Sequence, residues 1–267
     1  MARGHDRGAV ERRKGSEVTT VFFVGAGPGA PDLITVRGLR LLQSARVVMY
    51  AGALVPEELL AEVPADARRV DTQHLTLEQI TAEYAAARDA GLDVVRLHSG
   101  DLSIYSAVAE QVRRLNELGI GSTMVPGVPA FAAASAALGL ELTVPEVNQS
   151  VVLTRLSREA SKMPPRETLD NLGKAGALIV LHLATHLVDE VVRELLPNYG
   201  LDCPAAVVFQ ASQPDQVILR GTLGDIAQQV KDAGLKRSAV IMVGRSLAAE
   251  GFRDSHLYSC DRDRSLS

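Results

Sequence analysis

Three glycines and a proline make up the first stretch whose residue types could do chemistry. Gly25, Gly27 and Gly29 recur at every second position, and Pro28 lies between the last two. Glycine removes the side chain where a backbone turns tightly or approaches a ligand, and proline fixes φ and cannot donate a hydrogen bond. Such a loop suits a ligand that packs against the backbone, although a tight turn without a ligand explains the same residues.

A dinucleotide-binding fingerprint needs a further glycine three residues after the second one, where a helix packs on the preceding strand. Ala30 occupies that position, and Pro28 removes an N–H group that a phosphate would use. A nicotinamide-dependent oxidoreductase therefore stays as a disfavoured alternative.

Ser99, Gly100 and Asp101 form a second candidate loop, directly after the strand predicted at 94–98. Ligands of α/β proteins bind at the carboxyl ends of parallel strands. Asp101 could accept hydrogen bonds from the amine or hydroxyl groups of a cofactor, or it could be the N-cap of the following helix.

Two histidines have the spacing of metal ligands, because residues four apart share one face of a helix. His182, however, belongs to a strand pattern and His186 to the turn after it. Cys203 and Cys260 are too few for a disulfide framework or a cysteine-based zinc site, and they suggest a reducing compartment. We therefore expect no metal.

Strands are predicted where β-branched and aromatic residues run almost without interruption, which is the pattern of strands buried on both faces of a parallel sheet. They are expected at residues 18–24, 47–50, 69–70, 94–98, 124–125, 150–154, 177–183, 205–209, 216–220 and 239–243.

Helices are predicted between these strands from apolar residues at helical spacing. Asp32 is expected to cap the first helix, at 36–45, and Thr76 and Gln79 form a capping box before a helix that Gly91 ends. Further helices are expected after Pro56, at 104–118, at 187–196 where Pro197 stops the helix, and after Thr222 as N-cap.

A stiff segment with Pro126, Gly127 and Pro129 separates two halves in which strands alternate with helices. The sequence therefore predicts an α/β protein with one α/β domain at 18–127 and a second at 128–260. Residues 1–17 are expected to be a disordered tail, and residues 261–267 a second tail.

The composition limits the function classes. The chain has 267 residues, 46% of them hydrophobic, with no tryptophan and a net charge of −4. This charge disfavours a broad nucleic-acid-binding face, which requires clustered basic residues. Residues 1–17 lack the apolar core of a secretory signal, and no later run is long enough to span a membrane. We expect a soluble, cytoplasmic protein that binds neither nucleic acid nor membrane.

Four ordered motifs, GAGPGAPDLIT, SGDLSIYS, VPGVPAF and LTR at 153–155, resemble the tetrapyrrole methylases, a family of S-adenosylmethionine-dependent methyltransferases. The similarity runs from residue 18 to residue 258. Within the family, the stretches YAGALV, ELTVPEVNQSVVLTR, MPPRETL and FRDSHLYS resemble the branch that methylates a carbon of a precorrin in cobalamin biosynthesis.

The resemblance implies two α/β domains with S-adenosylmethionine in the cleft between them, a tetrapyrrole (precorrin) substrate and a homodimer. The chemistry needs no metal, because the sulfonium methyl is already activated and the protein mainly aligns the reactants. The residues implied to contact the cofactor are Pro28, Ser99, Gly100, Asp101, Ile104, Pro129 and Ala130, with the backbones of His182 and Ala211.

A polycarboxylate substrate requires cationic donors. Arg155 and Arg158, in a basic loop with Lys162 and Arg166, are the candidates, although a solvated charged loop is an equal interpretation. Tyr105 could line the tetrapyrrole trough or be a core aromatic.

Three positions depart from the family pattern. Leu102 replaces a common proline, Ser106 replaces a common glycine, and Ala51 stands where related uroporphyrinogen methylases carry an aspartate thought to accept a proton. We therefore assign no general base. A non-catalytic tetrapyrrole-binding protein, a methylase of another tetrapyrrole carbon or of a cobalt-containing precorrin, and an RNA or protein-histidine methylase of the same fold stay as alternatives.

Overall fold

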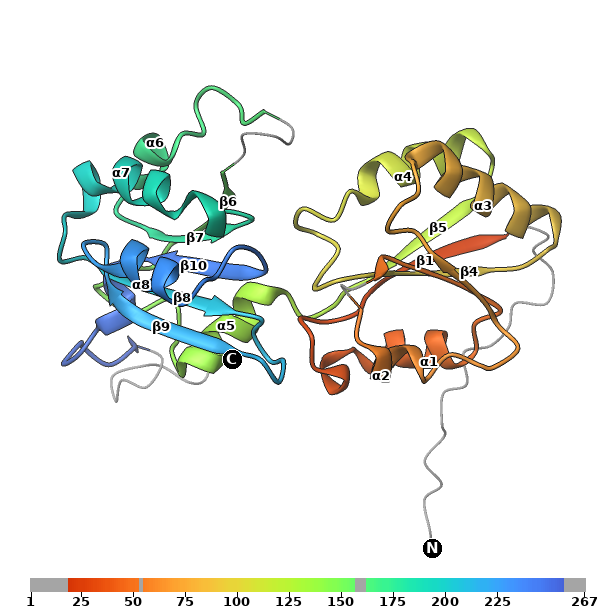
Figure 1. The fold of residues 1–267 in the computed structure, drawn as a ribbon, viewed down its shortest axis with the longest axis horizontal. Coiled ribbons are helices and arrows are strands. Elements are labelled where there is room, and N and C mark those ends of the chain that lie inside the picture. Colours follow the sequence, from red (N-terminus) through yellow and green to blue (C-terminus); the bar gives the residue numbers. More distant parts are fainter. Residues whose placement is uncertain (1–18, 53–54, 157–161, 257–267) are drawn as a thin grey trace, which may run out of the picture. The chain divides into compact units, whose positions relative to one another are not determined.

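The computed structural model describes residues 19–52, 55–156 and 162–256 (Figure 1). These residues form two compact units. The first comprises residues 19–25, 36–98 and 102–126, and the second comprises residues 26–35, 99–101 and 127–256. The two loops with the candidate motifs therefore group with the second unit, although each follows a strand of the first. The domain boundary predicted at residue 127 stays a proposal, as does the cofactor cleft expected between the domains.

The first unit contains a five-stranded sheet in the order β3-β2-β4-β1-β5. All its pairings are parallel, as predicted from the apolar runs. Its strands are β1 (Thr20–Gly25), β2 (Val47–Tyr50), β3 (Arg68–Asp71), β4 (Val94–His98) and β5 (Gly121–Val125).

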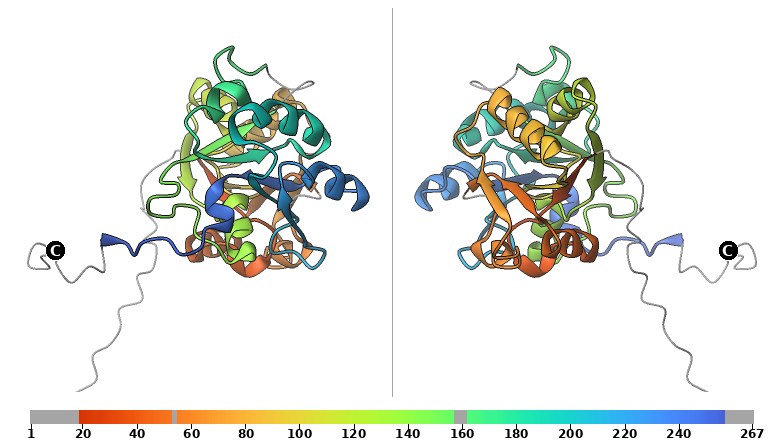
Figure 2. Two further views of the ribbon diagram at one scale, coloured as in Figure 1. Left: turned by 90° about the vertical axis from the view of Figure 1, so that its left-hand side faces the viewer. Right: turned by 90° about the vertical axis from the view of Figure 1, so that its right-hand side faces the viewer.

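Helices cover both faces of this sheet, with α3 and α4 on one face and α1 and α2 on the other (Figures 1 and 2). Phe23, Tyr84 and Leu115 belong to the core under α3 and α4. Burial on both faces explains why β1 and β2 are almost entirely apolar. The helices are α1 (Val36–Gln43), α2 (Glu57–Leu60), α3 (Leu77–Asp89) and α4 (Val108–Glu117).

The second unit contains a mixed sheet in the order β6-β7-β10-β8-β9. Only β6 and β7 pair in parallel; β10 runs antiparallel to β7 and β8, and β8 runs antiparallel to β9. The predicted parallel sheet is therefore wrong for this unit. A strand that helices cover on both faces is apolar whether it runs parallel or antiparallel to its neighbours, so composition does not reveal strand direction. The connection between β8 and β9 is too short for a parallel crossover and permits only a hairpin.

In this second unit, α5 packs on one face of the sheet and α6, α7 and α8 pack on the other. The strands are β6 (Val151–Arg155), β7 (Leu178–His182), β8 (Pro204–Phe209), β9 (Val217–Thr222) and β10 (Ala239–Val243). The helices are α5 (Ala130–Leu138), α6 (Leu169–Gly173), α7 (Val188–Tyr199) and α8 (Ile226–Asp232), with short 3-10 helices at Pro31–Leu33, Thr185–Leu187 and Arg245–Ala248.

Two predicted helix starts lie later in the structure. Asp32 is not the N-cap of α1, because it lies inside the 3-10 helix Pro31–Leu33 and α1 begins at Val36. Helix α4 begins at Val108 rather than at residue 104, because Tyr105 and Ala107 adopt left-handed backbone angles, with φ of 53° and 52°. A residue with positive φ cannot continue a right-handed helix.

Two further helix ends differ from the prediction. Helix α7 continues past Pro197 to Tyr199 and stops before Gly200. A proline in the last turn removes only one backbone hydrogen bond, so the helix does not break there. The N-cap residue of α8 is Asp225 rather than Thr222. The Asp225 carboxylate accepts a hydrogen bond from the Thr222 N–H at 2.7 Å, which closes the turn before the helix.

Among the described residues, no helix combines the length and the apolar character that crossing a membrane requires.

The capping box of α3 is confirmed, and it gives a test of the first unit. The Thr76 hydroxyl accepts a hydrogen bond from the Gln79 N–H at 3.3 Å, and the Gln79 side chain accepts one from the Thr76 N–H at 2.8 Å. Thr76→Ala should lower the free energy of unfolding by about 1 kcal/mol in urea denaturation. Thr81→Ala is the control, because the Thr81 hydroxyl bonds back to the Leu77 carbonyl inside the same helix and caps nothing. Equal losses in both variants would contradict the assigned cap.

Candidate functional site

The two candidate glycine loops are joined by a pair of peptide hydrogen bonds. The Gly27 N–H donates to the Gly100 carbonyl at 3.2 Å, and the Gly100 N–H donates to the Gly27 carbonyl at 2.7 Å. Both residues have positive φ, 83° and 69°. A Cβ atom on Gly27 would lie 2.9 Å from the Leu33 carbonyl oxygen. Gly27 therefore has no room for a side chain against Leu33, and both glycines have the left-handed backbone with which the two loops, far apart in the sequence, bond to each other.

A third motif adjoins the second loop. A Cβ atom built on Gly100 would lie 3.8 Å from the Ala130 nitrogen and 4.0 Å from the Pro129 Cα. The Asp101 carboxylate accepts a hydrogen bond from the Gly127 N–H at 2.8 Å. The structure therefore places Gly100 and Asp101 against the segment that leads into α5.

Asp101 is not a helix cap. The following helix, α4, begins at Val108 and has Ala107 as its N-cap residue. The capping interpretation of Asp101 is therefore wrong, and its carboxylate instead connects two loops of the second unit.

The hairpin between β8 and β9 contacts the first glycine loop through side chains. The Ser212 hydroxyl accepts a hydrogen bond from the Ala30 N–H at 3.0 Å, and the Gln213 amide nitrogen donates to the Pro28 carbonyl at 3.3 Å. Ala211, a predicted cofactor contact, is buried beside them. Sequence reasoning missed Ser212 and Gln213, because a serine and a glutamine in a polar loop have no distinctive spacing.

His182 is the last residue of β7 and lies edge-on to Phe131 of α5, with ring centroids 6.5 Å apart. Burial lowers the pKa of His182, so the imidazole is neutral at pH 7. Arg155 ends the neighbouring parallel strand β6 in register with His182. The predicted strand position of His182 is confirmed, whereas Arg158 lies outside the described residues.

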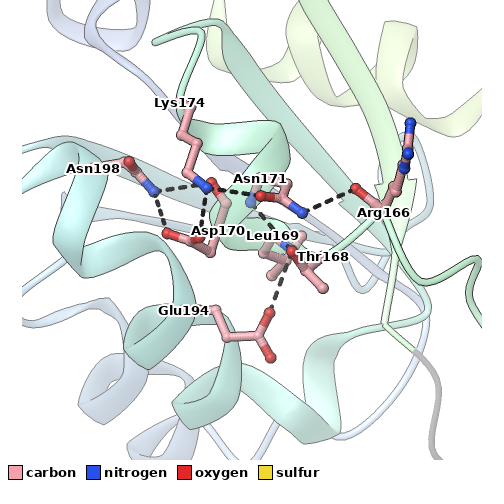
Figure 3. Close-up of polar contacts among 8 residues, drawn as sticks. All are labelled: Arg166, Thr168, Leu169, Asp170, Asn171, Lys174, Glu194 and Asn198. Atoms are coloured by element: carbon pink, nitrogen blue, oxygen red, sulfur yellow. Dashed lines mark hydrogen bonds and ion pairs between the residues drawn. The ribbon is translucent and has the colours of Figure 1, made fainter.

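Arg166, from the predicted basic loop, is attached to α6 by a polar network (Figure 3). The Asn171 side chain donates to the Arg166 carbonyl at 3.3 Å, while Lys174 forms an ion pair with Asp170 at 3.1 Å. Asn198 of α7 donates to Asp170 at 3.0 Å. In Figure 3 the Arg166 guanidinium extends away from this network.

Ile104 and Tyr105 lie in the first unit, in the turn that precedes α4. Tyr105 is 46% exposed, which contradicts the core-aromatic interpretation. The two departures from the family pattern have local roles here. Leu102 is buried in the core under α3 and α4, and the Ser106 hydroxyl donates to the Leu102 carbonyl within this turn.

His98 ends β4 directly before the second loop. Burial, and then the positive charge of Arg96, lower the pKa of His98 to about 3, against the opposing effect of a hydrogen bond with the Ser106 backbone. Arg96 is only 4% exposed, and its Nε donates to Gln111, which also accepts a hydrogen bond from the Tyr84 hydroxyl. His98 is therefore neutral throughout the physiological pH range.

The described residues contain no group of three His, Cys, Asp or Glu side chains that could hold a metal ion. Cys203 is a buried free thiol, and burial raises its pKa. Cys260 lies outside the described residues.

Comparison with known proteins identifies relatives of nearly the full chain. The sequence profile of the tetrapyrrole (corrin/porphyrin) methylases matches residues 20–227. A precorrin-4 C(11)-methyltransferase from Rhodococcus erythropolis is 59% identical over 245 residues, which are 92% of this chain and 98% of that protein.

Two solved structures share the fold. The X-ray structure of a cobalamin biosynthetic enzyme, cobalt precorrin-4 methyltransferase, superposes with a TM-score of 0.84 at 37% identity, over 86% of this chain and 96% of that one. The uroporphyrin-III C-methyltransferase of Thermus thermophilus, solved with S-adenosylhomocysteine, gives a TM-score of 0.73 at 27% identity over 85% and 98% of the two chains.

The neutral state of His98 predicts a pH dependence of stability. Between pH 6.5 and about pH 3 the unfolded state binds a proton that folded His98 does not bind, so stability falls as the pH falls through this window. In urea denaturation at pH 7 and pH 5, His98→Gln should lose less unfolding free energy on acidification than the wild type. Identical losses in the two proteins would contradict the assigned pKa of His98.

Proposed function

The chain belongs to the tetrapyrrole methylases, and on that premise we propose that it transfers the methyl group of S-adenosylmethionine to C-11 of precorrin-4, giving precorrin-5 in cobalamin biosynthesis. The observation that carries this proposal is the 59% identity to a precorrin-4 C(11)-methyltransferase over nearly the full length of both chains. The stretches that resemble the cobalamin branch of the family lie within this similarity.

The residues of the second unit fit a cofactor of this kind. Backbone and small side chains come together at Pro28, Gly100, Pro129 and Ala130. The buried Ala211 lies in the hairpin that contacts the first loop. A nucleoside with an amino-acid tail needs such close-packed backbone together with a few polar groups. Asp101 and the neutral His182 belong to the same unit. We propose that these residues, with Ser99 and Ile104, contact S-adenosylmethionine.

When bound, S-adenosylmethionine would supply a methyl group on a positively charged sulfur: a nucleophilic ring carbon would bond to the methyl carbon in line, the carbon–sulfur bond would break, and S-adenosylhomocysteine would leave. The chain then has to orient the two reactants and exclude water rather than provide a strong base. The two buried histidines are consistent with a reaction that needs no strong base, because His98 and His182 both have lowered pKa values and stay neutral. Ala51 follows Tyr50 and provides no carboxylate.

We propose that Arg155 and Arg158 bind carboxylates of the substrate and that Tyr105 lines its trough. Arg155 lies at the carboxyl end of β6, and Tyr105 is exposed next to the second loop. A homodimer is proposed from the family resemblance, and a cytoplasmic location stays a prediction.

Metal-free precorrin-4 is the first choice of substrate, because the relative with 59% identity acts on precorrin-4, whereas the solved cobalt precorrin-4 methyltransferase is 37% identical. Cobalt-precorrin-4 is the second candidate. Leu102 and Ser106 give no support to a non-catalytic protein, since both have local structural roles.

Methyl transfer tests the proposal directly. The purified protein, with S-adenosylmethionine labelled in its methyl carbon, should convert precorrin-4 to a product that is one methyl group heavier, with the label at C-11 in the carbon NMR spectrum. Cobalt-precorrin-4 and uroporphyrinogen III are the comparison substrates, and we expect slower or no transfer to them. Folded protein that binds S-adenosylhomocysteine and methylates none of the three would leave a non-catalytic binding protein as the better interpretation.

Asp101 offers a test of the cofactor contacts. Asp101→Ala should weaken S-adenosylhomocysteine binding by about 1–3 kcal/mol in calorimetric titration, because a charge-assisted acceptor is lost and Gly127 is released. Asp225→Ala is the matched control, since the Asp225 carboxylate accepts a hydrogen bond from a backbone N–H at 2.7 Å in another part of the unit. Equal affinity in wild type and Asp101→Ala would remove Asp101 from the cofactor site.

A further inference from the structure

The peptide groups of the first glycine loop are almost all used within the second unit. Both groups of Gly27 bond to Gly100, the Pro28 carbonyl accepts from Gln213, and the Ala30 N–H donates to Ser212. The Ala30 carbonyl accepts from the Leu33 N–H at 3.1 Å. Pro28 has no N–H to donate. Each of these groups is therefore held in a defined direction.

Gly29 is the exception in this loop. It is buried, yet within residues 19–52, 55–156 and 162–256 neither its N–H nor its carbonyl makes a hydrogen bond. More than nine in ten buried backbone groups bond to the protein or to ordered water, so these two groups are expected to bond to water or to a ligand. The Gly29 N–H is thus a donor that the described residues leave for a ligand.

Gln213 packs directly on Gly29. A Cβ atom on Gly29 would lie 2.2 Å from the Cγ atom of Gln213 and 2.7 Å from its amide nitrogen. Gln213 therefore covers one side of the Gly29 backbone while its amide donates to the neighbouring Pro28 carbonyl. The Gln213 side chain therefore both packs on Gly29 and fixes the carbonyl of the residue before it.

The hairpin that carries this side chain is itself under constraint. Gln210 and Ser212 have positive φ, 44° and 70°, a conformation that costs free energy for residues other than glycine. It is held by hydrogen bonds from the Gln210 N–H to the Ser238 carbonyl at 3.0 Å and from the Ser212 N–H to the Gln216 side chain at 2.8 Å. Strained backbone that neighbours hold in place is common at ligand sites.

We propose that Ser212 and Gln213 are positioning residues for the cofactor. They hold the loop of residues 27–30 by its Ala30 N–H and Pro28 carbonyl, so that the Gly29 N–H donates a hydrogen bond to an acceptor atom of bound S-adenosylmethionine. This inference rests on the proposed function only in naming the cofactor.

Three variants and one control distinguish the loss of the Gln213 amide donor, the loss of the Ser212 hydroxyl and a general disturbance of the hairpin. Gln213→Glu keeps the length that packs on Gly29 but cannot donate to the Pro28 carbonyl, Ser212→Ala removes the acceptor of the Ala30 N–H, and the third variant combines both changes. Asp215→Ala is the control, because Asp215 is an exposed residue of the same hairpin.

Calorimetric titration with S-adenosylhomocysteine should show about fivefold weaker binding in each single variant and about twentyfold weaker binding in the double variant. Asp215→Ala should bind as the wild type does, and all four variants should unfold at temperatures similar to that of the wild type. In turnover, KM for S-adenosylmethionine should rise while kcat and KM for the tetrapyrrole stay unchanged. An unchanged dissociation constant in the double variant would overturn the proposal, as would a loss of kcat with no change in KM.

Hydrogen exchange in the free protein gives a measurement that needs no ligand. The peptide covering residues 26–34 should exchange faster in Gln213→Glu and in the double variant than in the wild type or Asp215→Ala. Equal exchange in all proteins would overturn the positioning role. Wild-type protein that binds S-adenosylhomocysteine but methylates no tetrapyrrole would refute the proposed function alone, whereas no binding by the wild type would refute both.

Discussion

The contact on which the rest of the candidate site depends is the reciprocal pair of peptide hydrogen bonds between Gly27 and Gly100. Two hydrogen bonds join loops that lie more than seventy residues apart, and both partners need a left-handed backbone that only glycine adopts without cost. The other contacts involve residues close to these two glycines in the sequence. Asp101 accepts a hydrogen bond from Gly127, and the β8–β9 hairpin bonds to Pro28 and Ala30.

Burial determines the electrostatic character of the two histidines next to the motifs. His98 and His182 each end a strand, and each has a lowered pKa because desolvation disfavours the imidazolium form. Arg96 adds to the effect at His98 through its charge. Neutral imidazoles can orient groups but are weak bases, which suits a reaction whose leaving group is already activated. Geometry is thus the main contribution that this chain can make to methyl transfer.

Strands and capped helices could be predicted because their signals are local. The apolar run of β1 and the Thr76–Gln79 box of α3 depend on neighbouring residues alone, and both are confirmed. Strand direction could not be predicted, because β8 and β10 are as apolar as the parallel strands of the first unit. The start of α4 was missed because the positive φ of Tyr105 and Ala107 has no signature in residues that are not glycine.

The sequence by itself determined the family, the glycine loops, the Ser99–Gly100–Asp101 motif and the candidate polar residues, because these follow from residue types at short spacing. Only the tertiary structure decided which of them meet. It brought Ser212 and Gln213 to the first loop across more than 180 residues, and it assigned Asp101 to Gly127 instead of a helix end. Such contacts come from the folding of distant segments into one unit, and a hydroxyl or an amide in a loop does not indicate which peptide group it will bind.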